Sequence, residues 1–398
     1  MPQISKKGVD MPQSAIRKLV PFSEAAKARG IKVHHLNIGQ PDIETPKGAL
    51  KQMAEHEIGV LAYAPSAGIM SFRKKLAEYY QKNNIMIDAN QIIVTCGGSE
   101  ALQIAFTMCF NPGDEIIIPE PYYSNYNTFA HVADTVIKTI PSDIHTGFAL
   151  PPIEEFEKAI TPRTKAIMIC NPNNPTGYLY TKEELLKVAE IVKKHDLFLF
   201  ADEVYREFCY DGHPHFSVME IPGIEQNVVL LDSVSKRYSA CGARIGCIIT
   251  RNEELYKIGL RFAASRLAPP TFGQIFSEYA IDTPAEYFKA VNDEYIARRN
   301  TLVEGLNKIP GVFCPTPKGA FYTMVELPVD DSDKFCQWLL TDFNYNGETV
   351  MMAPGTGFYA DPKLGLHQVR MTYCICQDDL RAAMKCLEEA LKVYPGRI

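Results

Sequence analysis

Residues 91–110 read QIIVTCGGSEALQIAFTMCF, and this stretch contains the structural unit on which the fold depends. The apolar run Ile92–Thr95 predicts a short buried strand, which the glycines Gly97 and Gly98 end. Apolar residues then recur at the offsets of one helix face, at Leu102, Ala105, Phe106 and Cys109. The stretch therefore predicts a strand, a tight turn and a helix in succession.

The same alternation continues to about residue 250. Short β-branched runs alternate with amphipathic stretches, a pattern that is typical of parallel strands joined by crossover helices. The further runs that we expect to form strands are Glu115–Pro119, Lys165–Cys170, Leu197–Ala201, Val228–Leu231 and Gly246–Thr250. The sequence therefore predicts an α/β core.

The pattern changes at about residue 283. A long charged helix follows, then a stretch rich in proline and glycine, then strands mixed with helices, and finally the amphipathic helix Asp378–Tyr394. We therefore expect three parts: an N-terminal arm and small-domain segment over residues 1–40, a large domain over residues 41–283, and a small C-terminal domain over residues 284–398.

Composition narrows the class of protein. Of 398 residues, 46% are hydrophobic and 22% are charged, which is the balance of a globular enzyme. The net charge of -6 is spread along the chain without a basic stripe, so we expect no nucleic-acid partner. There is no signal-peptide pattern and no apolar run of membrane-spanning length. Eleven cysteines without a secretion signal favour reduced thiols and a cytoplasmic location.

The glycine turn at Gly97 and Gly98 could bind an anion. A helix N-terminus offers unpaired N–H groups and the positive end of its dipole, and glycine lets the backbone approach a phosphate closely. By itself the turn is more often a plain connection between a strand and a helix. Neither of the common glycine-rich nucleotide-binding patterns occurs here.

A second informative stretch, residues 232–246, reads DSVSKRYSACGARIG and contains Lys236. A lysine that forms a Schiff base must lose its proton readily, although most lysines are simply solvated. Two other polar groups follow predicted strands, with Asp202 in FADEVY and Asn174 in NPNNPTG. Because strand ends of open parallel sheets gather ligand sites, we expect these groups to lie together with Lys236.

The motifs resemble those of one known family. Seven segments occur in its order: NIGQPD at 37–42, YAPSAG at 63–68, GGSEAL at 97–102, NPNNPTG at 171–177, ADEVY at 201–205, SVSKRYSACGARIG at 233–246 and VRMTY at 369–373. Through these segments nearly the whole chain resembles the class I and II aminotransferases of the aspartate aminotransferase superfamily, of fold type I. The resemblance implies an α/β large domain with a mostly parallel seven-stranded sheet sandwiched by helices. It also implies a smaller α+β domain, formed by the N-terminal segment and the C-terminal third.

The resemblance further implies pyridoxal 5'-phosphate as the cofactor, with a role for each matching residue. Lys236 would hold the cofactor as a Schiff base and then move a proton. Asp202 would face the ring nitrogen and keep it protonated. Tyr205 and Asn174 would hydrogen-bond the ring hydroxyl, and Tyr123 would stack on the ring.

The remaining roles concern the phosphate and the substrate. The phosphate would be held by groups from two turns, which are Gly98, Ser99, Glu100, Ser233 and Arg244. Arg370 would bind the substrate α-carboxylate with its planar fork, with Asn174 and Gly39 beside it. Tyr63 would reach the phosphate of a neighbouring subunit, which implies a homodimer with shared active sites.

The expected activity is a ping-pong transfer of an amino group from an L-amino acid, aspartate-like or other, to a 2-oxo acid such as 2-oxoglutarate. A C–S β-lyase of the same fold is the alternative. A non-catalytic regulatory protein ranks lower, because no DNA-binding segment is present. If the substrate carries a distal carboxylate, Arg266 is the candidate to recognise it, and Arg261 lies close by in the sequence.

Other residues receive structural predictions. His213 and His215 are assigned to a surface loop, and no metal site is expected. Arg298 and Arg299 are assigned to the solvated side of a helix. The aromatic residues Phe321, Tyr322 and Phe358 either line the substrate site or belong to the core.

Overall fold

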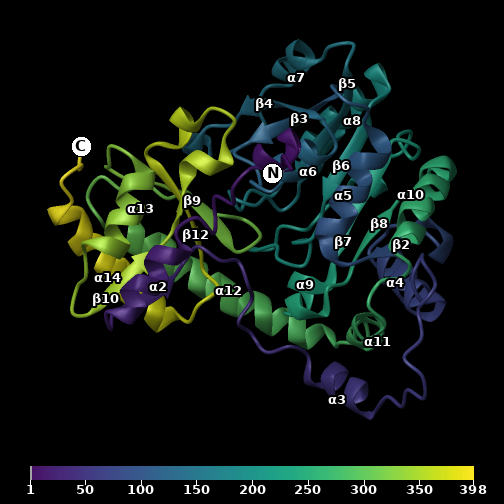
Figure 1. Ribbon diagram of the computed structural model, residues 1–398, viewed down its shortest axis with the longest axis horizontal. Coiled ribbons are helices and arrows are strands. Elements are labelled where there is room, and N and C mark those ends of the chain that lie inside the picture. Colours follow the sequence, from purple (N-terminus) through teal and green to yellow (C-terminus); the bar gives the residue numbers. More distant parts are fainter. Residues whose placement is uncertain (1) are drawn as a thin grey trace.

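The computed structural model describes residues 2–398, and its centre is a seven-stranded sheet (Figure 1). The strands lie in the order β2-β8-β7-β6-β5-β3-β4. Strand β8 runs antiparallel to both of its neighbours, and the other pairs are parallel. The strand bounds are β2 Ile92–Thr95, β3 Glu115–Glu120, β4 Val136–Pro141, β5 Thr164–Cys170, β6 Phe198–Asp202, β7 Val228–Ser233 and β8 Gly246–Ile249. The prediction of a mostly parallel seven-stranded sheet is confirmed.

The six strand positions predicted from residue patterns are all present, with ends that differ by at most two residues. Strand β4 was not among them. It lies at the edge of the sheet, where most of its side chains are exposed or half-buried, so it lacks the continuous apolar run that marks a buried strand.

Helices cover both faces of this sheet (Figure 1). Side chains of α5, α6 and α10 share one apolar core with one face, and side chains of α4, α7, α8 and α11 share a second core with the other. The bounds are α4 Met70–Lys82, α5 Gly97–Cys109, α6 Tyr126–Val132, α7 Ile153–Ala159, α8 Lys182–His195, α9 Val234–Arg237, α10 Glu253–Ser265 and α11 Thr271–Ala280. The sheet is therefore sandwiched by helices, as the resemblance implied.

A second assembly combines segments from both ends of the chain. Strand β1, Lys32–His35, pairs in parallel with β10, Glu348–Met351, and an antiparallel sheet has the order β11-β12-β9. Its other elements are α2 Val20–Ala28, α12 Ala285–Leu306, β9 Tyr322–Glu326, α13 Ser332–Thr341, β11 Ala353–Pro354, β12 Gln368–Thr372 and α14 Gln377–Val393. Helix α3, Lys47–Glu55, packs against α11 instead, and the short helix α1, Lys6–Val9, precedes α2. Residues of α2, β1, α12, α13 and α14 share one core. This shared core supports the proposed division near residues 40 and 283, which stays a prediction.

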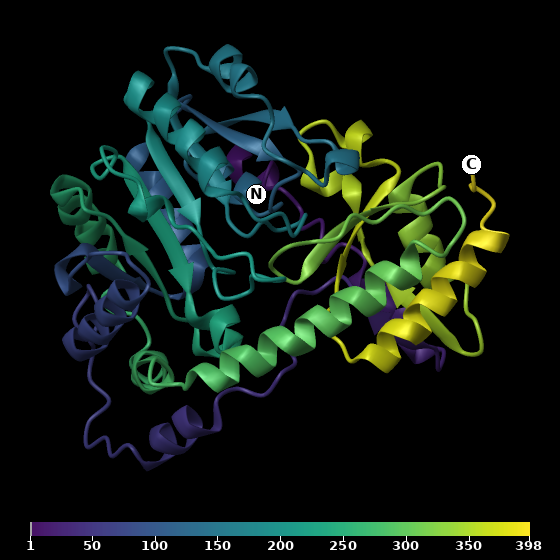
Figure 2. The same ribbon diagram turned by 180° about the vertical axis from the view of Figure 1, so that it is seen from behind.

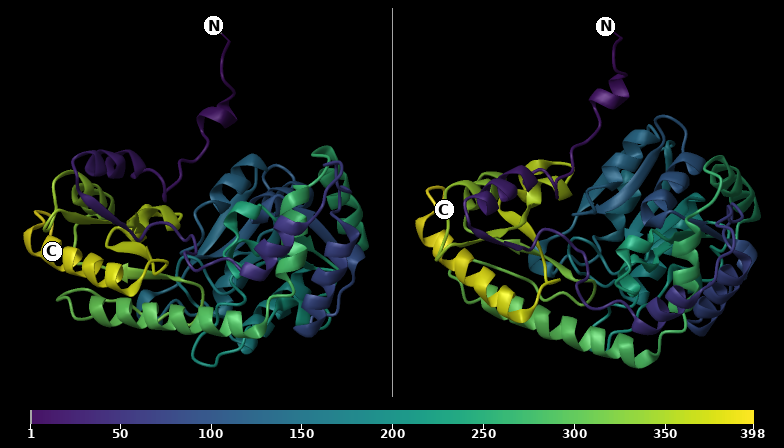
Figure 3. Two further views of the ribbon diagram at one scale, coloured as in Figure 1. Left: turned by 90° about the horizontal axis from the view of Figure 1, so that it is seen from below. Right: turned by 60° about the horizontal axis from the view of Figure 1, so that its bottom comes forward.

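Short 3-10 helices complete the chain: Ala89–Gln91, Ile144–Thr146, Val218–Glu220, Cys241–Ala243, Gly355–Phe358 and Pro362–Gly365. The N-terminal end stands out from the rest of the molecule (Figure 3). Within residues 2–398, no helix is long and apolar enough to cross a membrane.

Helix α12 runs from the large sheet to the smaller assembly (Figure 2). The prediction that Arg298 and Arg299 lie on its solvated side is wrong, because their side chains are 6% and 3% exposed. Arg298 forms an ion pair with Asp42 at 2.6 Å, and Arg299 forms one with Asp211 at 2.7 Å. These acidic residues are distant in sequence, so the helical pattern alone did not indicate that the arginines are covered.

Candidate active site

Several of the predicted site residues lie at the carboxyl ends of the parallel strands. Asp202 is the last residue of β6 and lies beside Cys170, the last residue of β5, in the strand register. Ser233 is the last residue of β7, and the single turn of α9 follows it directly. Because parallel strands end at one edge of a sheet, the segments after β5, β6 and β7 meet there.

Lys236 lies in α9 and is half-buried. Its Nζ donates a hydrogen bond to the carbonyl oxygen of Gly39 at 2.8 Å and lies 3.6 Å from Sγ of Cys241. The same carbonyl accepts a hydrogen bond from the Tyr322 hydroxyl at 3.4 Å. Gly39 has no room for a side chain, since an added Cβ would lie 1.7 Å from the Tyr322 hydroxyl oxygen. The lysine amine is therefore held against a segment of the N-terminal region.

Asp202 is a buried carboxylate without a cationic partner in the described part of the chain. Its Oδ2 accepts a hydrogen bond from the Tyr126 hydroxyl at 2.8 Å, and its Oδ1 accepts one from the Val204 backbone at 3.4 Å. Burial raises the pKa of Asp202 to about 6, although the Tyr126 hydrogen bond acts in the opposite direction. A positively charged ligand atom at this carboxylate would therefore relieve an unfavourable state.

Arg370 in β12 is the counterpart of Asp202, a buried cation. Its side chain is 1% exposed, and it forms no ion pair with any carboxylate of residues 2–398. The guanidinium donates to Oδ1 of Asn174 at 3.1 Å and to the backbone oxygen of Asn37 at 2.5 Å, and its Nε has no partner. Burial lowers the pKa of Arg370. The site therefore brings Arg370 and Asn174 together, as expected, and offers a charge and an unused donor for a ligand carboxylate.

Aromatic rings surround this guanidinium. The centroid of the Tyr322 ring lies 4.7 Å from Cζ of Arg370, and that of the Phe358 ring lies 5.0 Å away. The Tyr205 hydroxyl lies 3.0 Å from the Tyr322 hydroxyl. Phe321 and Phe358 are both fully buried, but Phe321 packs against Tyr205, whereas Phe358 packs against the guanidinium. Tyr322 and Phe358 therefore line the candidate site.

Tyr123 is half-buried near the same group of residues. Its ring packs edge-on against Tyr126, with ring centroids 5.4 Å apart, and its hydroxyl accepts a hydrogen bond from Asn125 at 2.8 Å. Tyr126 was not predicted as a site residue, although it lies in the same EPYYSNY segment, because its contact with Asp202 spans 76 residues of sequence.

The first turn of α5 forms a cradle that is closed by an arginine. Gly97 has φ +76°, and an added Cβ there would lie 2.5 Å from a guanidinium nitrogen of Arg244. Gly98 lies near Ser233, whose side chain is the closest to an added Cβ at 3.8 Å. The Ser99 backbone lies in the first turn of α5, and its side chain is exposed. These groups, from two turns far apart in sequence, fit an anion.

Glu100 and Arg266 form an ion pair beside this cradle. The Glu100 carboxylate accepts a hydrogen bond from the Cys96 backbone at 2.7 Å and lies 3.1 Å from Nε of Arg266. The other Arg266 nitrogens donate to the backbone oxygens of Ser66 and Val94, at 3.1 Å and 2.6 Å. All three guanidinium nitrogens of Arg266 already donate to protein oxygens, which argues against the assignment of Arg266 to a distal substrate carboxylate. Arg261 lies exposed on α10.

Tyr63 lies apart from these residues. Its side chain is 81% exposed and belongs to a segment that also exposes Val60 and Leu61. The chain by itself therefore does not bring Tyr63 into the site.

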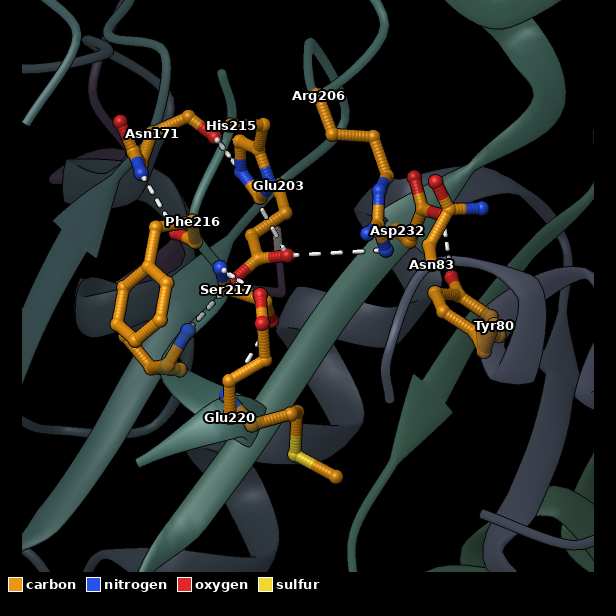
Figure 4. A network of polar contacts seen from close by, with 12 residues as sticks. Tyr80, Asn83, Asn171, Glu203, Arg206, His215, Phe216, Ser217, Glu220 and Asp232 are labelled. Atoms are coloured by element: carbon orange, nitrogen blue, oxygen red, sulfur yellow. Dashed lines mark hydrogen bonds and ion pairs between the residues drawn. The ribbon is translucent and has the colours of Figure 1, made fainter. Parts of the chain in front are cut away.

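A buried ionic network lies behind the site (Figure 4). It includes His215, whose prediction as a surface residue is wrong: the side chain is 9% exposed, and Nε2 lies 3.7 Å from Glu203. Burial lowers the pKa of His215 well below its usual value. His213 is exposed, as expected. Within the described residues, no group of three or more histidine, cysteine, aspartate or glutamate residues could hold a metal ion.

The family model for aminotransferases of class I and II matches residues 31–387, so the chain belongs to this family and is a transaminase. An aspartate aminotransferase of Pyrococcus horikoshii is 33% identical over 388 residues, which cover 96% of this chain and 95% of the relative. The solved structure of the Thermus thermophilus aspartate aminotransferase with maleate has a TM-score of 0.88 at 29% identity and covers 98% of this chain and 100% of its own. An alanine aminotransferase of Pyrococcus furiosus has a TM-score of 0.90 at 29% identity, with the same coverage.

Members of this family use pyridoxal phosphate, and the residues described above fit that group. The cofactor carries an anionic phosphate, an aldehyde that reacts with an amine, and a ring nitrogen that can be positively charged. The Gly97 cradle with Arg244 fits the phosphate, the half-buried Lys236 fits the aldehyde, and the unpaired Asp202 fits the ring nitrogen.

Proposed function

We propose that this protein is a pyridoxal-phosphate-dependent aminotransferase that acts by a ping-pong mechanism. It transfers an amino group from an L-amino acid to a 2-oxo acid such as 2-oxoglutarate. The observation that carries this proposal is that Arg370 is a buried guanidinium without a carboxylate partner within the described residues. Arg370 donates a hydrogen bond to the backbone oxygen of Asn37, and Lys236 donates one to the backbone oxygen of Gly39, two residues further along the same segment.

Each residue contributes a definite function to this proposal. When bound, the cofactor supplies an electron sink that stabilises negative charge at the substrate α-carbon. Lys236 would hold the cofactor, and its amine would be the group that moves a proton at that carbon. The Asp202 carboxylate stabilises positive charge on the ring nitrogen. The Tyr205 hydroxyl and the Asn174 amide hydrogen-bond the ring hydroxyl oxygen.

The other contacts orient the two ends of the ligand. Tyr123 stacks on the ring, and Arg370 with Asn174 and Gly39 binds the substrate α-carboxylate. The first turn of α5 and the segment from the end of β7 to Arg244 would hold the phosphate, through Gly98, Ser99, Glu100, Ser233 and Arg244. Since Glu100 is neutralised by Arg266, its carboxylate does not oppose the phosphate charge, and its backbone N–H remains the useful group.

The active unit in this proposal is a homodimer. Tyr63, exposed on its own chain, reaches the cofactor phosphate of the partner subunit, and the exposed apolar residues Val60 and Leu61 are covered in the same interface. The N-terminal end, which stands out from the body, is available to contact the partner (Figure 3). A cytoplasmic location stays a prediction, which eleven unpaired cysteines support.

An absorbance experiment tests the function. The protein with pyridoxal phosphate should show a visible band that one amino donor bleaches and 2-oxoglutarate restores, and Lys236→Ala should not show the band. A panel of donors that includes aspartate and alanine identifies the substrate class. Release of pyruvate and ammonia from cystathionine without any 2-oxo acid, together with no bleaching by simple donors, would show a lyase instead.

A further inference from the structure

Four charged side chains of the buried ionic network behind the site are neighbours in sequence of site residues. Glu203 follows Asp202, Arg206 follows Tyr205, Asp232 precedes Ser233, and Arg237 follows Lys236. The network residues face the opposite side of the same segments, where they are buried. Figure 4 shows Glu203, Arg206 and Asp232 in one group with Tyr80.

Asp232 and Arg237 lie at the two ends of the short segment that contains Lys236. Asp232 lies near the end of β7, and Arg237 is the last residue of α9. The Asp232 Oδ2 accepts hydrogen bonds from NH2 of Arg237 and from the Tyr80 hydroxyl, and its Oδ1 accepts one from the Ser233 backbone at 2.7 Å. The Asp232 carboxylate therefore connects Ser233 and Arg237, on either side of Lys236, with Tyr80 of α4.

Arg237 is held from further directions as well. Its guanidinium lies 4.3 Å from the Tyr79 ring centroid, and its Nε lies 3.6 Å from a Glu207 carboxylate oxygen, to which the Tyr79 hydroxyl also donates. Arg206 lies over the rings of Tyr79 and Tyr80, at 5.6 Å and 5.0 Å, and 3.8 Å from Glu203. The Arg237 guanidinium is therefore in contact with Asp232, Glu207 and Tyr79 at once.

Helix α9 cannot fix its own position. It contains four residues, and a single helical turn has too few internal hydrogen bonds to be stable alone. Burial of an ion pair is also an inefficient way to stabilise a core, since apolar residues of similar volume often do so as well. The directional ion pair of Arg237, by contrast, defines where the backbone of the neighbouring Lys236 lies, which apolar packing does not do.

We propose that Arg237 and Asp232, supported by Tyr79 and Tyr80, are positioning residues that hold Lys236 in the orientation in which its amine reaches the cofactor and substrate. The inference rests on the proposed role of Lys236 as the anchor of pyridoxal phosphate. Arg237 touches neither ligand, so it acts only through the chain.

The test compares Arg237→Met with Arg299→Met. Arg299 is a matched control, because it is also buried, pairs with an aspartate, and lies over a tyrosine ring, that of Tyr210 at 5.4 Å. Arg237→Met should lower kcat per bound cofactor about a hundredfold, as expected for a small displacement of a reacting group, with the KM of the amino donor within about threefold. The dissociation constant of pyridoxal phosphate should rise about tenfold. Arg299→Met should lower the melting temperature by a similar amount while kcat and the dissociation constant stay within about twofold of the native values.

Hydrogen exchange of the apoprotein gives a readout that does not depend on activity. The backbone amides of residues 234–238 should exchange faster in Arg237→Met than in the native protein or in Arg299→Met. Tyr80→Phe removes one hydroxyl donor to Asp232 and keeps the ring, so it provides the test if Arg237→Met does not fold. It should lower kcat per bound cofactor about threefold with unchanged KM.

The proposal is overturned if the variants that fold lose thermal stability as Arg299→Met does but keep kcat per bound cofactor, cofactor affinity and exchange at 234–238. Failure of the proposed function has a different signature. A native protein that binds pyridoxal phosphate at Lys236 but transaminates no donor would refute the function, whereas cofactor affinity and hydrogen exchange would still decide the positioning role.

Discussion

Arg370 and Arg266 are both arginines with little exposure, and each was a candidate to bind a substrate carboxylate, but their surroundings differ. Arg266, at the end of α10, is neutralised by Glu100 and donates to two backbone oxygens. Arg370, in β12, has two oxygen acceptors, a free Nε and no carboxylate. A buried charged group whose hydrogen bonds and ion pair are all made within the protein supports the fold. A buried charged group that lacks an oppositely charged partner indicates where an oppositely charged ligand group binds.

The same distinction applies to the acidic residues. Asp202 is buried without a cation, while Asp232 and Asp211 are paired with Arg237 and Arg299. Asp202 and Arg370 are therefore two buried charges of the candidate site that have no oppositely charged partner within the described residues.

The largest effect is expected at Arg370. Arg370→Met should lower kcat/KM about a hundredfold for every amino donor, because loss of a charged, forked hydrogen bond costs about 3 kcal/mol. Steady-state kinetics with several donors measures it, and the visible spectrum with pyridoxal phosphate is the control and should be unchanged. A loss smaller than about fivefold for all donors would remove Arg370 from the substrate site.

Asp202 should make cofactor binding depend on pH. With its pKa raised to about 6, the carboxylate is charged above pH 6 and neutral below it, and only the charged form attracts a positive ring nitrogen. From pH 7 to pH 5 the affinity of the apoprotein for pyridoxal phosphate should therefore fall about tenfold more than that of Asp202→Asn. Equal pH profiles for the two proteins would contradict the assignment.

Tyr126 should have an intermediate effect. Its hydroxyl stabilises the charged form of Asp202, so Tyr126→Phe should raise the pKa of Asp202 further and weaken cofactor binding at pH 7 about fivefold. Fluorescence titration of the apoprotein measures the affinity. Tyr122→Phe is the control, since that hydroxyl donates to Asn127 instead.

The smallest effect on catalysis is expected at Arg266. Arg266→Met should change the KM of aspartate and of alanine by less than about threefold, while the melting temperature falls by about 2 °C with the loss of a partly buried ion pair. If the KM of aspartate rises more than tenfold while that of alanine stays constant, Arg266 recognises the distal carboxylate after all, and the comparison with Arg370 is wrong.

The sequence predicts what local patterns encode. Apolar runs located six strands, and the segments around Asp202, Asn174 and Lys236 indicated one shared edge of the sheet. It did not predict contacts between distant segments. Arg299 and Asp211 are 88 positions apart, and Arg266 and Glu100 are 166 apart, so their pairing cannot be read from helical spacing.

Position on the sheet explains the other differences. Strand β4 was missed because an edge strand with exposed side chains lacks an apolar run. His215 was assigned to the surface because its loop is rich in polar residues, although the side chain turns inward to Glu203. Local sequence gives the element, and long-range partners decide which side chains the fold covers.

The antiparallel pairing of β2 with β8 has a consequence for synthesis of the chain. Ile92 pairs with Ile249, so the ribosome must add the intervening residues, at about 5–20 per second, before β2 has its partner. For roughly 8–30 seconds the apolar strand and the glycine turn after it are without β8 and Arg244. The anion cradle therefore assembles late in translation, and β1 waits longer still, for β10. Until β10 and β8 have been synthesised, β1 and β2 lack the strands with which they pair in the fold.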